Sequence, residues 1–279
     1  MITADQLAYI EEHAYIPEHI THYVTAVSKA EPFLFGEFLA YAKKDYLIFV
    51  GYPLRETFEE KRMKKALDEV TKRFKPGEIA LTAPIIPSFL RERVQRSSDY
   101  YYRLNLSALS VSQKLRNMLS RAGRELSVKK SRDFAKEHQK LIEAFLKTHP
   151  VDEATRFIFE RIGDYLSSST TAWVFEARNR KGELVAFDVA ELWPRDYILY
   201  MFNFNSRDRF VPGASDLLLS EIIRHAQGEH KKYINLGLGI NSGVAFFKRK
   251  WGGAPFLPYN FWLYKPSRDE ALETFLQKL

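Results

Sequence analysis

Two carboxylates and two neighbouring polar side chains have the residue types needed for proton transfer. Asp188 and Glu191 lie in one apolar stretch, and Tyr200 and Asn203 lie in the next. A carboxylate can accept a proton, a tyrosine can donate one, and an amide can stabilise a developing oxyanion. Because Asp188 and Glu191 are three residues apart on a predicted strand, they point to opposite faces of the sheet. At most one of them serves a given site, and either could be an ordinary surface carboxylate.

A second set of residues could bind an anionic ligand or co-substrate. Its members follow these strands or lie near the end of the chain: Asn205, Arg207, Arg209, Gly213, Ala214, Ser215, Asn241 and Lys248. A predicted helix starts at Ala214, and helix N-termini attract phosphates and carbonyls through unpaired N–H groups and the helix dipole. The loop arginines could add charge-assisted hydrogen bonds. The alternatives are solvated arginines, asparagines that cap a strand end, a core tyrosine at Tyr200, and a solvated helix face at Lys248.

The elements that must position these residues occur twice along the chain. GEFLAYA from Gly36 and DYLIFV from Asp45 correspond to GELVAFD from Gly182 and DYILYM from Asp196. Each pair predicts an antiparallel hairpin. Each hairpin is followed by an amphipathic helix and another strand: 57–74 and 78–85 in the first copy, 214–230 and 233–238 in the second. This shared order predicts a duplicated fold.

The second copy is the more complete of the two. A basic helix over 110–126 connects the lobes, so we expect an N-terminal lobe over 1–109 and a C-terminal lobe over 127–279. The predicted order of the C-terminal lobe is strand, two helices, three strands, helix, strand, helix, strand. The short helix spans 242–250 and the last strand spans 261–264.

Composition narrows the classes of function. The chain has 279 residues, 46% of them hydrophobic and 28% charged, which is typical of a folded protein. It has no cysteine and no zinc-type histidine spacing, so no metal site is predicted. The start lacks a secretory signal and no apolar run is long enough to span a bilayer, so the cytoplasm is the expected location.

Charge points to an anionic partner. The net charge is +7, which favours a phosphorylated cofactor, tRNA or an acidic lipid surface. The basic run from Lys114 to Arg132 could follow a nucleic-acid backbone, although no aromatic residues are interleaved for base stacking. An exposed basic face on a connecting helix is the simpler interpretation.

The element order and one local motif resemble a known family. The predicted order of elements in the C-terminal lobe resembles the GNAT acyltransferase fold. The local motif is the strand Tyr233–Gly237 followed by Phe246-Phe247-Lys248-Arg249-Lys250-Trp251-Gly252-Gly253, which is similar to a segment common in Fem-type proteins. The likeness is greatest to the tandem-lobed branch, which includes Fem-type peptidoglycan aminoacyl-ligases and the catalytic domain of phosphatidylglycerol lysyltransferases. Asn235 stands where an aspartate is usual. The resemblance covers about 110–265 well and 33–106 loosely.

This resemblance implies an α/β (α+β) protein with two GNAT-like lobes, each a mixed, mainly antiparallel sheet flanked by helices, the N-terminal lobe being degenerate. It also implies transfer from acyl-CoA or aminoacyl-tRNA to an amine or hydroxyl acceptor, with no bound prosthetic group. Two departures from the family pattern affect the expected donor and the expected activity. Val211-Pro212-Gly213-Ala214 keeps one glycine of the pyrophosphate loop, and Phe246 and Phe247 stand where many acetyltransferases carry a tyrosine acid. The first favours aminoacyl-tRNA over acyl-CoA, and both favour the alternative of a non-catalytic binding protein that retains the fold.

Overall fold

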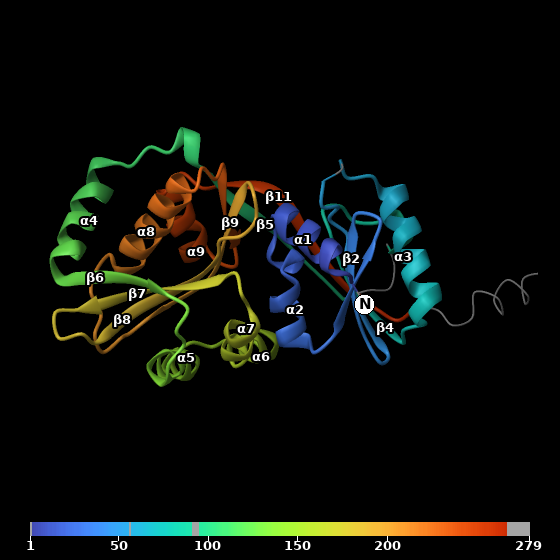
Figure 1. The fold of residues 1–279 in the computed structure, drawn as a ribbon, viewed down its shortest axis with the longest axis horizontal. Coiled ribbons are helices and arrows are strands. Elements are labelled where there is room, and N and C mark those ends of the chain that lie inside the picture. The colour runs from blue at the N-terminus through green and yellow to red at the C-terminus, as the bar shows by residue number, and fades with distance from the viewer. Residues whose placement is uncertain (1, 56, 91–94, 267–279) are drawn as a thin grey trace, which may run out of the picture. The chain divides into compact units, whose positions relative to one another are not determined.

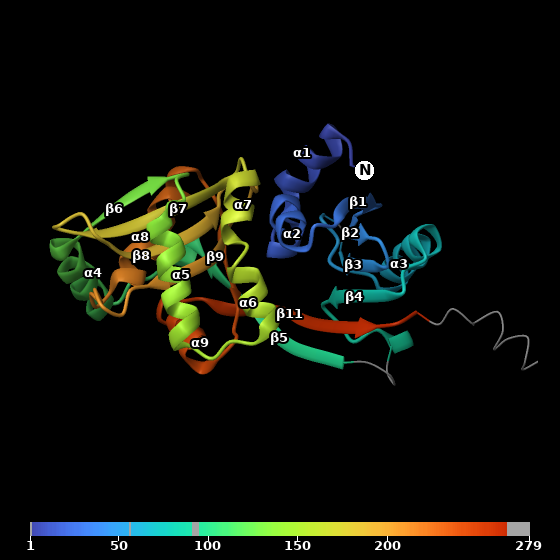
Figure 2. The same cartoon turned by 90° about the horizontal axis from the view of Figure 1, so that it is seen from below.

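The computed structural model describes residues 2–55, 57–90 and 95–266, and the chain forms two compact units (Figures 1 and 2). Unit 1 comprises the described residues among 1–2, 30–99 and 258–279. Unit 2 comprises 3–29 and 100–257. Strands β5 (Gln95–Asn105) and β11 (Ala254–Tyr264) contribute residues to both units.

Unit 1 is a sheet covered by one long helix. Its strand order is β1 (Glu31–Phe35), β2 (Phe38–Lys43), β3 (Tyr46–Val50), β4 (Glu78–Ala83) and β11. Helix α3 (Glu60–Phe74) packs on this sheet through an apolar stripe at helical spacing: Met63, Ala66, Leu67 and Val70. A short 3-10 turn, η2 (Ser88–Leu90), follows β4.

Unit 2 is a larger mixed sheet with helices on both faces. Its strand order is β5, β10 (Tyr233–Leu238), β9 (Tyr197–Asn205), β8 (Leu184–Glu191), β7 (Ala172–Asn179) and β6 (Leu126–Ser131). Its helices and 3-10 turns are α1 (Ala4–His13), η1 (Pro17–His19), α2 (Thr21–Ser28), η3 (Leu106–Ala108), α4 (Gln113–Glu125), α5 (Lys136–Thr148), α6 (Glu153–Phe159), α7 (Ile162–Ser168), α8 (Ala214–Gly228) and α9 (Ser242–Lys250). Figure 1 shows α4 and α8 on one face of this sheet and α5 and α7 on the other.

Strand alternation divides the core of unit 2 between these faces. Ala186 and Ala190 of β8 pack with the α4 and α8 side, and Phe187 and Val189 pack with α5 and α7. The side chains of Asp188 and Glu191 therefore follow the expected alternation to opposite faces.

The internal repeat predicted from the sequence is present in the backbone. The carbonyl of Asp45 accepts the N–H groups of Gly77 (2.8 Å) and Glu78 (3.1 Å). The carbonyl of Asp196 accepts the two corresponding N–H groups, from Lys232 and Tyr233, each at 3.0 Å. In both copies a hairpin is followed by a helix and then by a strand parallel to the second hairpin strand.

The copies differ in how far the parallel strands stay paired. The β3–β4 ladder continues from Tyr46↔Glu78 to Val50↔Thr82. The β9–β10 ladder begins at Tyr197↔Tyr233 and ends at Leu199↔Asn235, although β9 runs on to residue 205. In the second copy, β9 therefore continues beyond Leu199 without pairing with β10.

One side chain explains where the β9–β10 ladder ends. The Asn235 Oδ1 atom accepts the N–H of Gly237 at 2.8 Å, and Gly237 has a positive φ of 77°. The Asn235 Nδ2 atom donates to the carbonyl of Tyr15 at 2.7 Å. This local side-chain bond takes a backbone donor away from the ladder and bends β10 away from β9. The corresponding residue of the first copy is Ala80, which has no side chain that can do this.

Several elements differ from the sequence-based expectations. The last strand was expected in the C-terminal lobe, but β11 pairs with β4 through Asn260–Tyr264. The segment 3–29, assigned from the sequence to the N-terminal lobe, packs in unit 2, where Ile20 and Ala26 join the core beside α7. The second of the two helices predicted early in the C-terminal lobe, from the apolar residues between Phe157 and Tyr165, is in fact two helices, α6 and α7. Strand β1 and helix α2 were not predicted. No helix among the described residues is long and apolar enough to cross a membrane.

We predict that Asn235→Ala lowers the free energy of unfolding by about 1–2 kcal/mol, because it removes two part-buried hydrogen bonds, one to the Gly237 N–H and one to the Tyr15 carbonyl. Asn235→Asp keeps the acceptor for Gly237 but places a carboxylate against the Tyr15 carbonyl. It should therefore be less destabilising in acid, where a protonated carboxyl can donate. Urea unfolding at two pH values measures both effects. The exposed Asn117→Ala is the control, and equal losses in the two alanine variants would contradict the assignment.

Candidate functional site

A chain of polar side chains connects the interior of the sheet to the start of α8. Asp188 and Asn203 are register partners on β8 and β9, and Asn203 Nδ2 donates to Asp188 Oδ1 at 2.5 Å. Asn203 Oδ1 accepts from Asn205 Nδ2 (2.9 Å) and from the Ser215 hydroxyl (3.2 Å). Asn205 Nδ2 also lies 2.8 Å from the Ser215 oxygen. Four of the predicted site residues are thus brought together by direct contacts.

A bulge in β9 adds Tyr200 to this group. The β8–β9 register changes from Val189↔Phe202 to Ala190↔Tyr200, so Met201 is the extra residue. Without the bulge, Tyr200 and Asn203 would point to opposite faces. With it, Tyr200 packs on the α8 side of the sheet, the face that also holds Ala190.

Asp188 is fully buried, and its side chain interacts with the Tyr200 hydroxyl as well as with Asn203. The Asp188 Oδ2 atom and the Tyr200 hydroxyl are both buried without a well-formed hydrogen bond to any described residue. Burial raises the pKa of Asp188 to about 8, against the opposing effects of Asn203 and Tyr200, and the charge of Asp216 adds to the increase. Burial and the nearby Asp188 raise the pKa of Tyr200 well above its usual value. A carboxyl whose pKa lies near neutrality is suited to general acid–base chemistry.

One side of the start of α8 is closely packed against α4. Gly213 is the N-cap residue with φ +84°, and no side chain caps this helix. A Cβ atom on Gly213 would lie 2.9 Å from Met118 Cγ of α4. One residue beyond Ser215, the buried Asp216 accepts from Trp251 Nε1 (2.9 Å) and pairs with Lys250 (2.6 Å). These contacts join the end of α9 to the first turn of α8, where the side chain of Ala214 is also buried.

The two loop arginines are not gathered at this helix start. Arg209 Nε donates to the carbonyl of Leu184 at 3.1 Å. The pKa of Glu137 on α5 is lowered mainly by its hydrogen bond with Arg178, and the charge of Arg209 adds a small part. Arg207 is exposed and has no polar partner among the described residues. Neither has a contact that directs it toward Ser215.

Lys248 lies where β9 and β10 separate. It is only 4% exposed, and its ammonium donates to the carbonyl of Leu238. A Cβ atom on Gly237 would be 3.6 Å from Lys248 Nζ and 3.8 Å from the Tyr200 carbonyl oxygen. The alternative that Lys248 sits on a solvated helix face is therefore wrong. Asn241, by contrast, caps α9 by accepting the N–H of Val244 at 2.9 Å.

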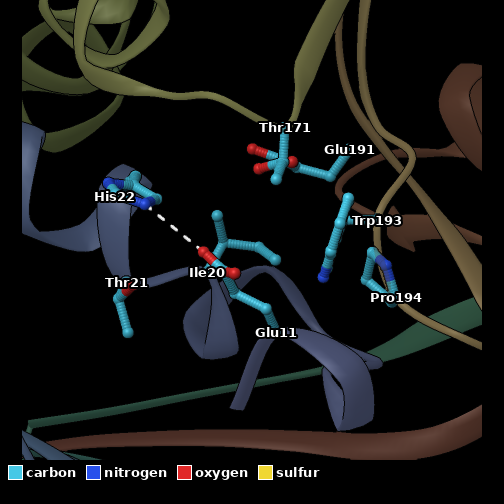
Figure 3. Close-up of a pocket in the computed structure, with 8 residues that line it drawn as sticks. All are labelled: Glu11, Ile20, Thr21, His22, Thr171, Glu191, Trp193 and Pro194. Atoms are coloured by element: carbon cyan, nitrogen blue, oxygen red, sulfur yellow. Dashed lines mark ion pairs between the residues drawn. The ribbon is translucent and has the colours of Figure 1, made fainter. Parts of the chain in front are cut away.

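Glu191 lies apart from the Asp188 group, on the other face of the sheet. Its Oε1 accepts from the Tyr165 hydroxyl of α7 and from the Ser169 hydroxyl at 3.3 Å. Its side chain lines a pocket between the sheet and the N-terminal helices, shown in Figure 3. The two carboxylates of β8 therefore belong to separate environments.

A buried titratable cluster was not anticipated from the sequence. Glu137, His138 and Glu176 are the one group of metal-ligating type found close together within the described ranges. Arg178 pairs with both glutamates, and His138 Nε2 lies 2.9 Å from Glu176 Oε1. His138 Nδ1 accepts the N–H of Ala135 at 2.9 Å. We interpret the cluster as an ion-pair network that attaches α5 to β7; its members are too distant in sequence to form a recognisable motif.

Known structures share this fold. No protein-family model matches the chain, and no curated protein is similar to it in sequence. The L-PGS structure from Bacillus licheniformis is 15% identical over 99% of this chain and 96% of that chain, with a TM-score of 0.62. A FemX structure is 11% identical over 99% of both chains (TM-score 0.65). A GCN5-related N-acetyltransferase from Kribbella flavida is 13% identical over 90% and 98% (TM-score 0.52). The chain therefore has a GNAT-like fold that resembles the L-PGS and Fem-type structures, and the predicted fold class is confirmed.

We predict that Asp188 makes the protein less stable as pH rises. Because the pKa of Asp188 is higher in the folded chain than in the unfolded chain, the folded state holds the extra proton between about pH 4 and pH 8. Its contribution to the unfolding free energy therefore falls across that window, by at most ~1.4 kcal/mol per pH unit. Asp188→Asn should remove this dependence. Urea unfolding should show that the free energy of unfolding of the variant, relative to that of the wild type, is higher at pH 8.5 than at pH 5. The same pH dependence in both proteins would contradict the prediction.

Proposed function

We propose that unit 2 transfers an acyl or aminoacyl group from an activated ester or thioester to an amine or hydroxyl acceptor. The observation that carries this proposal is the end of the β9–β10 ladder at Leu199↔Asn235. Beyond it, no strand of the described residues pairs with the edge of β9 that faces β10, so backbone groups on this edge could bind an extended donor. Tyr200 and Asn203 lie on the part of β9 beyond the end of the ladder, Asp188 is the register partner of Asn203 on β8, and the fold is shared with the transferases named above.

The proposed reaction needs one proton acceptor and one oxyanion stabiliser. The acceptor nitrogen or oxygen forms a bond to the donor carbonyl carbon, and the bond from that carbon to the leaving oxygen or sulfur breaks. We assign Asp188 as the group that takes the acceptor proton, and Tyr200 as the hydroxyl that gives a proton to the leaving oxygen or sulfur; the proton on Asp188 then passes to Tyr200, which restores both groups. The buried ammonium of Lys248 is suited to the developing oxyanion, since a preorganised charge acts strongly where water is excluded.

The donor that this site favours is an aminoacyl ester on tRNA rather than a coenzyme A thioester. Met118 and Ala122 of α4 cover the N-cap glycine of α8, where a diphosphate would have to approach. Arg209 is engaged with the Leu184 carbonyl. The exposed basic residues of α4 (Lys114, Arg116, Arg121 and Arg124) could instead contact a polyanion, either tRNA or an anionic lipid surface.

The runner-up function is a non-catalytic binding protein that keeps the fold. One observation favours it: Lys248 Nζ is already bonded to the Leu238 carbonyl within the separated region, so part of the space between the strands holds a side chain.

The first test compares donors by thermal unfolding and by direct binding. Total aminoacylated tRNA is expected to bind with an affinity that falls steeply as salt increases, and acetyl-CoA is expected to give little increase in melting temperature. Lys248→Met should weaken binding of the aminoacylated tRNA more than binding of the same tRNA after deacylation. If acetyl-CoA binds tightly and tRNA does not, the donor assignment is wrong. If neither ligand binds or raises the melting temperature, the result supports the alternative of a non-catalytic binding protein.

The second test measures transfer from radiolabelled aminoacyl-tRNA to two small acceptors, glycinamide and glycerol. Asp188→Asn should slow transfer by roughly 10²–10⁴-fold, the usual contribution of general acid–base catalysis, and leave tRNA binding unchanged. The wild-type rate should rise with pH toward a plateau above an apparent pKa near 8. Asn117→Ala on α4 serves as the matched surface control. Equal transfer by Asp188→Asn and wild type would refute the role of Asp188.

A further inference from the structure

A cluster of basic side chains lies at the edge of the sheet of unit 2, around the indole of Trp173. Lys130 is in β6, the last strand at this edge, and Arg132 follows directly after the strand (Figure 2). The Lys130 ammonium lies 4.0 Å and the Arg132 guanidinium 4.7 Å from the centroid of the Trp173 ring. Lys130 Nζ also lies 3.0 Å from Nε2 of His225, which is in the last turn of α8. Three basic side chains therefore meet at one place.

The alternation of β6 explains why these side chains share a face. Val128 packs against the core beneath α8, and Lys130 and Arg132 follow it at intervals of two residues. Lys129 lies between them on the other face, where it is exposed and pairs with Asp133 at 3.6 Å. The two adjacent lysines thus differ in their surroundings, since Lys129 has a carboxylate partner and Lys130 has a histidine.

The positive charge of this cluster is not balanced by an ion pair. Among the described residues, His225 is the one polar partner of the Lys130 ammonium, and Arg132 has no polar partner. An ammonium can only donate, so this contact requires a neutral His225 ring that accepts at Nε2. The charge of Glu229 reaches both Lys130 and His225, but no ion pair joins it to either within the described ranges.

The pKa values of the cluster are those of bases that lack a counter-ion. Burial lowers the pKa of Lys130; the charge of Glu229 opposes this effect and the charge of Arg132 adds to it. Burial also lowers the pKa of His225, and the charge of Lys130 is the next cause. Both groups therefore hold a proton less readily than they would in water, and an anion placed between them would reverse this effect.

Capping of α8 does not explain the position of the Lys130 ammonium. Basic side chains near a helix C-terminus often bind the last carbonyl groups. Here the carbonyl of His225 accepts the N–H of Glu229 at 3.0 Å, and the carbonyl of Ala226 accepts the N–H of Lys231 at 2.9 Å. Lys130 instead donates to the ring of His225.

We propose that Lys130, Arg132 and His225 form a binding site for a phosphate dianion, either free or at the end of a small phosphomonoester. Such a group supplies two negative charges and three acceptor oxygens to the ammonium, the guanidinium and the protonated imidazole. A carboxylate has one charge and two oxygens, so it matches the three donors less well. Arg132 is exposed and the other two side chains are half-buried, which leaves the site open to a ligand from solvent.

This inference goes beyond the proposed transfer reaction and does not rest on it. His225 is in the last turn of α8, whereas Ser215 of the candidate transfer site is in the first turn. The two sites are therefore at opposite ends of one helix.

Isothermal titration calorimetry at constant ionic strength tests the proposal with glycerol 3-phosphate and inorganic phosphate as ligands. We expect saturable binding with a dissociation constant on the order of 1 mM, since the ligands have few atoms. The tighter of the two identifies the source of the phosphate. Dimethyl phosphate, a singly charged diester, and acetate should bind at least ~10-fold more weakly. Equal binding of dimethyl phosphate, or no saturable heat with either dianion, overturns the proposal.

Two lysine variants locate the binding. Lys130→Met should weaken it by ~10-fold or more, since the change removes a charge-assisted hydrogen bond. Lys129→Met makes the same change of charge on the adjacent residue and should bind like the wild type. Glu229→Gln removes an opposing charge and should tighten binding several-fold. Equal losses in the two lysine variants would show a non-specific effect of charge and refute the site.

Proton NMR of the histidine rings gives a measurement that a purely structural role would leave unchanged. Saturating glycerol 3-phosphate should raise the pKa of His225, because the anion stabilises the imidazolium, and leave that of His149 on α5 unchanged. The His225 signal is assigned by its loss in His225→Gln. If circular dichroism shows that Lys130→Met is unfolded, Arg132→Gln decides, because this exposed side chain lies outside the core. Wild-type affinity in a folded Lys130→Met or in Arg132→Gln, or an unchanged pKa of His225, refutes the site.

Discussion

The feature on which the rest of the structure depends is the competition for one backbone N–H group at the end of β10. Asn235 binds the N–H of Gly237, and the parallel ladder with β9 stops at that point. In the first copy of the repeat, Ala80 leaves the backbone free and the ladder continues to Val50↔Thr82. A single amide side chain thus separates a closed strand pair from one with an unpaired edge. The polar residues of β9 and the ammonium of Lys248 have a functional interpretation because that edge is open.

The sheet of unit 2 keeps two acidic environments apart. Asp188 and Glu191 are three residues apart on β8, and alternation sends them to different layers. Asp188 joins a polar chain that ends at the hydroxyl of Ser215, while Glu191 bonds to Tyr165 of α7. Both carboxyls have a raised pKa because burial outweighs their hydrogen bonds. Their partners differ, so a ligand at one of them need not affect the other directly.

Periodicity and turn residues were sufficient to predict most elements of unit 2. The predicted bounds of β10 and α9, 233–238 and 242–250, agree with the structure. The apolar spacing from Phe157 to Tyr165 continues through the break between α6 and α7, so one helix was expected where there are two. Likewise, the pattern of β11 predicts a strand but contains no information about its partner, and it pairs with β4.

The candidate site could be predicted only as a set of residue types. The alternation rule correctly separated Asp188 from Glu191. It could not place Tyr200, because the extra residue Met201 changes the face on which Tyr200 lies. It also could not show that Lys248 is buried, since a lysine on an amphipathic helix is ordinarily solvated. Whether a side chain at a helix end reaches into the protein depends on tertiary neighbours, such as the Leu238 carbonyl, that have no sequence signature.

The paired carbonyl contacts of Asp45 and Asp196 have a consequence for how this protein can diverge. Each carbonyl accepts two successive N–H groups at the start of a parallel strand pair. The register of both copies is therefore set at the same end of the pair. Mutations accumulating at the opposite end can widen or narrow the gap between strands without shifting that register. The space between the strands of one copy can therefore change while the register of both copies stays the same.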